Sequence, residues 1–565
     1  MASESGSDVN TDSTSDSNSE AIRAAGLDQL QWDNRFLAEL PVDPSTVIRP
    51  RQVNRAVASR VTPVVASAPT VVAWSPEVSE QLAIAPEAWT EHAELMAQVF
   101  SGSTLVPGSD PHAACYGGHQ FGNWAGQLGD GRAMSLGEVV TPDHGHLTLQ
   151  LKGAGPTPYS RSADGMAVLR SSLREFICSE AMHHLGIETT RALSLVLTGD
   201  KVVRDMLYDG NPRPEPGAVV CRVAPSFIRF GNFQIFAARQ ELEELGKLAD
   251  FTIEHYFAHL LDDHEPKTNA LYEAFFDEVC TSTREMISGW MRVGFVHGVM
   301  NTDNMSIHGA TIDYGPYGWL EGFDPGWTPN TTDAAHRRYR YGQQPQIGQW
   351  NLMQLANALV QLTGETEPLE ESLKRYGEEY GRLDRQMWLS KLGINSESPR
   401  TSAGADTPEM ADTLVDDLHH LLMATETDMT IFFRRLASVN CANADELADR
   451  DLVAPLEEAY YLDGACEEVA PQTAAWLRRY AAIVGSDDAG RAEAMNRVNP
   501  IYVARNYLAQ LAIDAAEQND FGPVNEWLDV LKDPYSEQPG RQQYAQRRPE
   551  WARERPGCSQ LSCSS

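Results

Sequence analysis

Three oxygen-bearing side chains in the middle of the chain could hold a metal ion and the phosphates of a nucleotide. Asp303 and Asn304 are adjacent, and Asp313 follows within the sequence Ile-Asp-Tyr-Gly. Carboxylate and amide oxygens are ligands that a hard cation such as Mg²⁺ prefers, and Mg²⁺ usually shares its coordination sphere with substrate phosphates. We therefore expect Asn304 and Asp313 to bind Mg²⁺, or Mn²⁺, together with a nucleotide.

The spacing of these residues resembles the catalytic loop of a protein kinase, H-R-D-x-x-x-x-N, which is followed by D-F-G. His297 aligns with the histidine, Asn304 with the metal-binding asparagine and Asp313 with the later aspartate. Val299 then stands where a kinase has the aspartate that accepts the proton of the substrate hydroxyl. Because a valine cannot accept a proton, the sequence predicts a metal–nucleotide site that does not act as an ordinary kinase.

Charged and glycine residues earlier in the chain could bind the phosphates. Lys152 ends a strand-like segment, where a kinase has its phosphate-binding lysine, and Glu175 lies in a predicted helix from which it could form an ion pair with Lys152. Gly129 and Gly131 directly precede a predicted strand, and glycines there let backbone N–H groups approach a phosphate closely. Arg132 adds a positive charge at the same place.

Two further features could close over the nucleotide. Arg222 and Arg229 present guanidinium groups, which bind phosphate through a rigid two-pronged fork. This pair is a candidate clamp for the triphosphate, with salt bridges between two lobes as the alternative. Residues 153–165 are rich in Gly and Pro and include Asp164 and Gly165, so we expect a loop that folds over the nucleotide.

The order of the elements predicts the fold class. Strand-like segments come first, then one helix, further short apolar segments and finally many helices. The segments are 133–140, 146–152, a helix over 168–185, 219–223, 228–236, then helical patterns over 251–294, 350–362 and 410–533. We predict an α+β protein with a protein-kinase-like bilobal fold and an additional helical C-terminal region.

The composition shifts suggest five parts. We predict a disordered acidic tail at 1–26 and an N-terminal lobe with the Gly-rich nucleotide-binding loop at 27–236. A C-terminal lobe with the catalytic and metal-binding loop follows at 237–394, then a linker or loop at 395–409. Residues 410–565 form a helical C-terminal region with a Cys-containing tail.

The composition limits the compartment and the partners. The net charge is −34, and only seven of the 45 basic residues are lysines, which suits a protein dissolved in a cytoplasm of high ionic strength. No basic patch offsets this charge, so we expect no nucleic-acid partner. The chain has no apolar run of membrane-spanning length and no apolar signal segment at its start, so we expect no membrane partner and a cytoplasmic location.

On these motifs the chain resembles the selenoprotein O family, also called the YdiU family, of pseudokinase-fold protein adenylyltransferases. The matching blocks are 116–139, 152–196, 220–236, 297–325, 344–359, 499–513, 533–539 and the terminal Cys563-Ser-Ser. The resemblance implies that ATP binds in a flipped orientation relative to kinases. AMP is then transferred to Ser, Thr or Tyr hydroxyls of protein substrates, and pyrophosphate is released.

The resemblance also assigns roles to residues of this chain. It implies Asp303 as the catalytic proton acceptor, Asn304 and Asp313 as ligands of Mg²⁺, and Glu175 as the partner of Lys152. The residues that it places on the nucleotide are Gly129, Gly131, Arg132, Lys152, Asp164, Gly165, Arg222, Arg229 and Asp313.

The chain departs from the family pattern at three places. Met166 stands where relatives commonly have an arginine, so a phosphate contact from that side chain is lost. Pro329 replaces a cysteine that can form a regulatory disulfide with the C-terminal cysteine in relatives, which makes that bridge impossible here. Cys558 could pair with Cys563 instead, closing a small ring. No selenocysteine is present, so we expect no selenium chemistry.

The sequence leaves several alternatives open. The same site could transfer UMP from UTP with Mn²⁺, because the residues do not identify the preferred base. A protein kinase is disfavoured by Val299. A nucleotide-binding pseudokinase scaffold is disfavoured by the intact metal ligands, and a thiol-redox protein acting through Cys563 is a further alternative.

Overall fold

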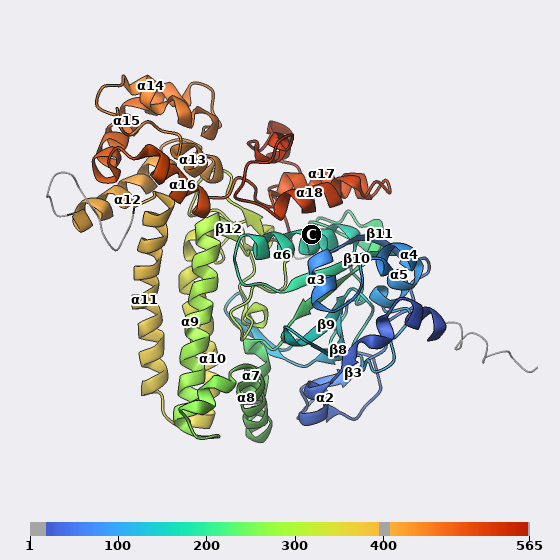
Figure 1. The fold of residues 1–565 in the computed structure, drawn as a ribbon. Helices are drawn as coiled ribbons and strands as arrows, with labels where there is room; N and C mark the ends of the chain where they lie inside the picture. The colour runs from blue at the N-terminus through green and yellow to red at the C-terminus, as the bar shows by residue number, and fades with distance from the viewer. Residues whose placement is uncertain (1–18, 395–406, 563–565) are drawn as a thin grey trace, which may run out of the picture.

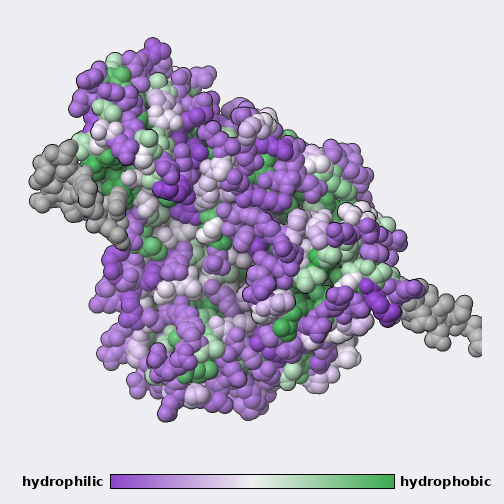
Figure 2. Space-filling view, in the orientation of Figure 1, coloured by the Kyte–Doolittle hydropathy of each residue, from purple (hydrophilic) through white to green (hydrophobic). Residues whose placement is uncertain are grey.

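The computed structural model describes residues 19–394 and 407–562, with the side chains of helix α12 described from Met410 onward. It has a sheet-rich half and a helix-rich half, and a further group of helices lies across one end (Figure 1). The α+β class with two lobes is therefore confirmed. The face shown in Figure 2 is mostly hydrophilic, as the composition leads one to expect.

The N-terminal lobe is built on one twisted sheet. Its order is β2-β3-β5-β8-β9-β11-β10-β4, and β1 pairs with β8. The bounds are β1 Gln31–Trp32, β2 Val42–Asp43, β3 Ala58–Arg60, β4 Thr70–Trp74, β5 His112–Ala114, β8 Ala133–Thr141, β9 Gly145–Lys152, β10 Arg191–Arg204 and β11 Arg213–Ala224. The predicted strands at 133–140 and 146–152 are confirmed as β8 and β9, which are antiparallel.

Alternation along β11 directs its side chains to opposite faces of the sheet. Val219, Cys221 and Val223 belong to the smaller apolar core under helices α3 Pro76–Gln81, α4 Ala88–Glu91 and α5 Ala93–Ser101. Val220 belongs to the main core instead. Arg222, two residues further along the strand, lies on the same face of the sheet as Val220. Val220 is paired with Lys152 of β9, so Lys152 and Arg222 reach the same face, on which the site is built.

Helix α6 Leu169–His184 confirms the predicted helix and packs against β10 and β11. Its residues are buried nearly all round, including Glu175. The segment 228–236 was expected to be another short apolar segment, but it enters helix α7 Phe230–Arg239. Phe230, Phe233 and Ala237 recur at helical spacing and are buried, which accounts for the helix.

The C-terminal lobe is mainly helical. Its helices are α7, α8 Leu242–Tyr256, α9 Asn269–Val293, α10 Gln344–Thr363 and α11 Glu367–Lys391. Helix α9 ends at Gly294, whose φ of 77° is the left-handed conformation that closes a helix. Strand β12 Phe295–Val296 then pairs with β13 Gly318–Trp319. The loop between these strands carries His297, the short helix η3 Thr302–Asn304 and Asp313.

The remaining helices form the C-terminal region. They are α12 Thr407–Met423, α13 Met429–Leu436, α14 Asp449–Val453, α15 Ala465–Val484, α16 Asp488–Val498, α17 Asn506–Ala516 and α18 Gly522–Leu531. Helices α17 and α18 pack against α6, so this region also supports the N-terminal lobe (Figure 1). In the described ranges, no helix has the length and apolar character needed to cross a membrane.

Leu561 and Ser562, the last described residues, are held by both lobes. The N–H of Thr331 donates to the carbonyl of Leu561 at 2.7 Å, and the N–H of Leu561 donates to the carbonyl of Pro329 at 3.1 Å. The hydroxyl of Ser562 bonds the carbonyl of Met206, in the connection between β10 and β11. Burial raises the pKa of the Cys558 thiol to about 11. Cys563, and with it the predicted ring, lies outside the described residues.

One predicted boundary needs correction. Residues 19–26 were assigned to a disordered tail, but Ile22 and Ala25 are buried in the smaller apolar core of the N-terminal lobe. The fold therefore begins before residue 27, because even a short segment can be ordered by apolar side chains that fit a core. The predicted linker at 395–409 falls largely outside the described residues, and the other boundaries stay predictions.

Candidate functional site

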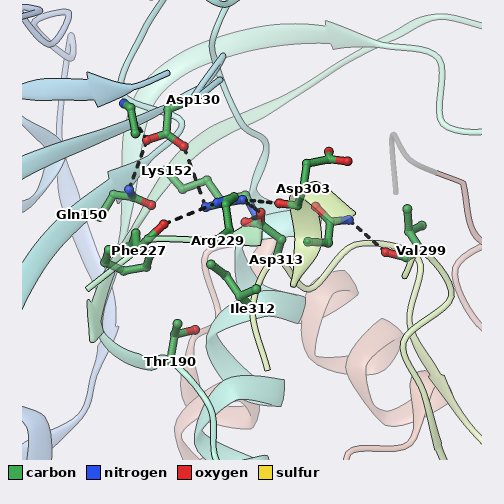
Figure 3. Close-up of polar contacts among 12 residues, drawn as sticks. Asp130, Gln150, Lys152, Thr190, Phe227, Arg229, Val299, Asp303, Ile312 and Asp313 are labelled. Atoms are coloured by element: carbon green, nitrogen blue, oxygen red, sulfur yellow. Dashed lines mark hydrogen bonds and ion pairs between the residues drawn. The ribbon is translucent and has the colours of Figure 1, made fainter. Parts of the chain in front are cut away.

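Asp313 is the centre of a buried cluster of charges, called here the Asp313 cluster, with Lys152, Arg222 and Arg229 as its cations. Figure 3 shows Lys152 and Arg229 beside Asp313. The Asp313 Oδ1 accepts from Lys152 Nζ at 3.3 Å and from Arg222 Nη1, and its Oδ2 accepts from Arg229 Nη1. Burial acts to raise the pKa of Asp313, but Arg229, Lys152 and Arg222 hold that pKa well below its usual range. The carboxylate is therefore ionised.

Backbone geometry and a histidine set the position of Asp313. Its φ is 59°, in the left-handed region that aspartate tolerates better than most residues. The carbonyl of Ile312 lies 2.9 Å from His297 Nε2, and since a carbonyl can only accept, this ring nitrogen donates. Burial lowers the pKa of His297, which favours the neutral ring. His297 thus supports the loop that presents Asp313.

Glu175 holds two of the cations. Its Oε2 is 2.6 Å from Lys152 Nζ, and its Oε1 is 2.9 Å from Arg222 Nη1. Burial lowers the pKa of Lys152, although Glu175 and Asp313 oppose that effect. The predicted proximity of Lys152 and Glu175 is therefore present in the structure. It depends on α6 packing against the sheet, which places a helix residue beside the end of β9.

Arg222 and Arg229 are both almost fully buried. Besides Asp313, Arg229 donates to the backbone carbonyl of Asp303 at 2.8 Å, and its guanidinium lies 4.5 Å from the centre of the Tyr116 ring. The two arginines thus link the N-terminal lobe and α7 to the catalytic loop. The arrangement matches the alternative of salt bridges between two lobes. Binding of the triphosphate by the two arginines stays a proposal.

Asp303 and Asn304 lie in η3, beside the Asp313 cluster. Burial raises the pKa of Asp303 to about 6. Its Oδ2 accepts from Gln120 Nε2 at 3.1 Å, whereas its Oδ1 is buried and has no hydrogen-bond partner among the described residues. Asn304 Nδ2 donates to the carbonyl of Val299 at 2.9 Å, which leaves the amide oxygen of Asn304 available as a ligand.

A hairpin of strands β6 Gly117–Gln120 and β7 Asn123–Gln127 fixes the catalytic loop. The N–H of His119 donates to Thr302 Oγ1 at 2.7 Å, next to the contact between Gln120 and Asp303. A Cβ at Gly118 would lie 2.7 Å from Asp303 Oδ1, so this position requires glycine. Gln120 was not predicted as a site residue, because only its long-range contact with Asp303 reveals its role.

The cluster opens into a cleft of about 670 Å³, which is a suitable size for a nucleotide. Ten of the predicted residues line it: Gly129, Gly131, Arg132, Lys152, Asp164, Gly165, Arg222, Asp303, Asn304 and Asp313. Glu175 and Arg229 lie behind this lining. Asp164 is paired with Arg204 at 2.7 Å, and the uncharged Met166 also lines the cleft.

A larger cavity, of about 990 Å³, lies between α13 and the segment 537–553. Its lining includes arginines and glutamates but none of the predicted site residues. Size alone therefore does not identify the functional site here. The smaller cleft is the better candidate because it joins a carboxylate–amide pair to buried cations.

The residues of the smaller cleft fit a divalent cation. Asp313 is ionised, Asn304 offers an amide oxygen, and the buried Asp303 Oδ1 has no partner in the described part of the chain. Hard cations take oxygen ligands of these kinds. The neighbouring lysine and arginines would match the charge of the phosphates that accompany such an ion.

A known protein family matches most of this chain. The family described as "Protein adenylyltransferase SelO" matches residues 49–532. The chain belongs to the SelO family. The resemblance seen in the sequence is thereby confirmed, and this chain is a nucleotidyltransferase of that family.

Relatives named "Protein nucleotidyltransferase YdiU" cover nearly the whole chain. The protein from Rhodopirellula baltica is 56% identical over 547 residues, covering 95% of this chain and 99% of the relative. The protein from Azoarcus sp. is 57% identical over 542 residues, with coverages of 95% and 99%. That from Aromatoleum aromaticum is 55% identical over 546 residues, with coverages of 95% and 100%.

Among solved structures, the chain is similar to ROP2 from Toxoplasma gondii, described as a virulence factor with a protein-kinase fold and no enzymatic activity. The identity is 13%, the match covers 55% of this chain and 87% of that chain, and the TM-score is 0.22. A superposition this weak carries no argument about this protein. The relation to kinases rests instead on how Lys152, Glu175 and Asp313 meet.

Proposed function

We propose that this protein transfers AMP from ATP to Ser, Thr or Tyr hydroxyls of protein substrates. The proposal rests on one observation, which concerns the positions of Val299 and Asp303. The kinase base position is a valine, yet a buried carboxylate lies in the same cleft as the metal ligands. Membership of the SelO family supports adenylyl transfer over other nucleotidyl transfers.

In this proposal the hydroxyl oxygen of the substrate attacks the α-phosphorus of ATP. The bond from that phosphorus to the oxygen bridging to the β-phosphorus breaks, and pyrophosphate leaves. Asp303 accepts the proton of the attacking hydroxyl, and its raised pKa of about 6 suits a general base near neutral pH. Transfer at phosphorus otherwise depends mainly on positioning and on neutralising charge.

The other residues bind and orient the nucleotide. Lys152, Arg222 and Arg229 neutralise phosphate charge, with Glu175 holding Lys152 in place. Gly129 is part of a turn that comes close to the Tyr159 ring, and with Gly131 and Arg132 it offers backbone and side-chain donors at the cleft wall. Asp164 and Gly165 also line the cleft, from the loop that follows β9. Mg²⁺ or Mn²⁺ held by Asn304 and Asp313 would neutralise phosphate charge and polarise the reacting phosphate.

The experiment is incubation of the pure protein with a protein acceptor and ATP labelled on the α- or, separately, the γ-phosphate. Intact mass is then measured, with UTP as a parallel donor. Retained α-label with a mass gain of one AMP is the expected result. Retained γ-label would show a kinase, and more extensive modification with UTP than with ATP, at a mass gain of one UMP, would show a uridylyltransferase. We also propose a cytoplasmic location. The assay includes low and molar KCl, because the acidic composition suits a cytoplasm of high ionic strength.

A further inference from the structure

Three arginines lie close together in the segment that follows the catalytic loop. Arg337, Arg338 and Arg340 are called here the arginine segment, and they lie between the short helices η4 Thr331–Asp333 and η5 Tyr341–Gln343. Among the described residues, none of their guanidinium groups has a carboxylate oxygen within 4.0 Å. This is unexpected in a chain with 79 acidic and 45 basic residues.

The contacts that these arginines do make are with uncharged groups. Arg340 donates to the carbonyl of Arg337 at 3.0 Å and to Gln343 Oε1 at 2.8 Å. Arg338 stacks over the Trp350 ring, with its guanidinium carbon 4.6 Å from the ring centre. Its Nε and Nη2 are buried and have no hydrogen-bond partner in the described ranges.

The nearest buried acid is already in use. The carboxylate of Asp333 accepts from the backbone N–H of Arg338 at 2.9 Å and from that of Tyr339 at 2.7 Å. It therefore shapes the turn. The charge of Arg338 acts to lower the pKa of Asp333, but among the described residues no guanidinium nitrogen of the arginine segment lies within 4.0 Å of this carboxylate. The exposed Arg337 and the half-buried Arg340 are therefore left without a carboxylate partner in the described part of a strongly acidic molecule, while Arg338 packs on Trp350.

The arginine segment lies beside the proposed base but outside the nucleotide cleft. Tyr339 donates to Asn301 Oδ1 at 2.6 Å and accepts from the N–H of Phe121 at 3.0 Å. Phe121 and Asn301 line the cleft together with Asp303, whereas the three arginines do not. A Cβ at Gly122 would lie 3.4 Å from the guanidinium carbon of Arg338, so Arg338 packs against the hairpin that holds Asp303.

The backbone of this segment is tied down. The N–H of Tyr341 donates to the carbonyl of Trp327 at 3.0 Å, and that of Gly342 donates to the carbonyl of Pro325 at 2.9 Å. The N–H of Thr331, which precedes the segment, donates to the carbonyl of Leu561, near the last described residue. The charges are thus presented on a pre-formed surface, which lowers the entropic cost of binding a partner there.

We propose that the arginine segment docks carboxylate side chains that flank the target hydroxyl of the protein substrate. This inference rests on the proposed function and names the class of substrate: a Ser, Thr or Tyr within an Asp/Glu-rich sequence. Opposite charges across an interface increase encounter rates and suppress wrong registers. The rest of this acidic chain would repel such a sequence, so the segment would also orient it toward Asp303.

The test uses peptides with one acceptor hydroxyl and flanks of Glu, Gln or Lys. Transfer is followed with α-labelled ATP, and binding is followed separately by fluorescence anisotropy without ATP. We expect kcat/KM to be about three- to tenfold higher for Glu flanks than for Gln flanks, mainly through the KM of the peptide. The double variant Arg337→Glu/Arg340→Glu should reverse this order and favour Lys flanks, while the KM of ATP changes little.

The matched control is Lys374→Glu/Arg450→Glu, which changes the net charge equally at side chains that are 77% and 80% exposed. It should keep the preference for Glu flanks. Equal affinity and equal transfer for Glu and Gln flanks would overturn the docking proposal while leaving adenylyl transfer intact. Binding that follows the predicted charge order without any transfer would support the docking site and contradict the proposed function.

Discussion

The Asp313 cluster and the arginine segment use the same side chain in opposite surroundings. Arg222 and Arg229 are buried, and each contacts the carboxylate of Asp313. Arg337 is exposed, and it shares with Arg338 and Arg340 the absence of a carboxylate partner among the described residues. Burying an unpaired charge costs several kcal/mol, whereas an exposed charge is solvated. A carboxylate partner is therefore needed for the buried Arg222 and Arg229, whereas the exposed Arg337 stays solvated until a partner binds. Arg338, which is half-buried, stacks on Trp350 instead.

The largest effect is expected from removing the carboxylate at the centre of the Asp313 cluster. Asp313→Ala leaves three buried cations without their common partner and removes a metal ligand. We expect transfer to fall by about 10³-fold or more and the free energy of unfolding to fall by about 3 kcal/mol. Labelled-AMP transfer and thermal unfolding measure the two effects.

Asp529→Ala is the control for that variant, since it removes an exposed carboxylate paired with Lys532 at 2.8 Å on α18. It should leave both quantities nearly unchanged. Asp313→Asn keeps the shape of the side chain, so it separates loss of charge from loss of packing. Near-normal transfer by purified Asp313→Ala would contradict the assignment of the site.

The next largest effect is expected at Asp303. Asp303→Asn keeps an oxygen toward Gln120 but removes the group that accepts the proton. We expect kcat to fall by about 10²- to 10⁴-fold, with little change in ATP affinity. Single-turnover transfer and equilibrium binding of ATP measure these quantities. A loss of ATP binding that matches the loss in kcat would assign Asp303 to nucleotide binding instead.

A second cluster, of Glu321 with Arg505 and Arg548, predicts that the stability of the protein depends on pH. Burial raises the pKa of Glu321 from 4.5 to about 7, although Arg505 and Arg548 oppose that effect. The folded protein then binds this proton more tightly than the unfolded chain does. The resulting stability is present below pH 4.5 and is lost as pH rises through about 7.

Glu321→Gln should remove that dependence. We expect the melting temperature of the variant, relative to wild type, to be several degrees higher at pH 8 than at pH 5. Glu493→Gln is the control, because Glu493 is an exposed partner of Arg497 with a side chain that is 73% exposed. A difference between Glu321→Gln and wild type that does not change with pH would show that Glu321 does not titrate in this range.

The smallest effect expected is that of salt, which should act more strongly on the arginine segment than on the buried Asp313 cluster. The Debye length falls from about 10 Å at 0.1 M to about 3 Å at 1 M salt, and buried pairs are screened less than exposed ones. Raising KCl should increase the KM of a Glu-flanked peptide about threefold or more. The stability supplied by the Asp313 cluster should change less. Equal salt effects on peptide KM in wild type and in Arg337→Glu/Arg340→Glu would contradict this.

Local sequence patterns predicted the elements that depend on local contacts. The helix over 168–185 and the strands at 133–140 and 146–152 were correct because their apolar spacing has a clear period. The start of α7 was missed, because a short apolar run fits a strand or a helix equally well. Gln120 was missed because its contact with Asp303 joins residues 183 apart in the chain.

The sequence by itself determined the chemistry that is available: oxygen ligands at Asn304 and Asp313, a valine at position 299, and a large excess of acidic side chains. Residue type and spacing are enough to identify these features. Only the tertiary structure decided which charges are neutralised. Arg222 reaches Asp313 across 91 residues, whereas the exposed Arg337 has no carboxylate partner in the described chain although it is close to Asp333 in sequence. Packing sets both distance and burial, and the two together decide whether a charge must be paired.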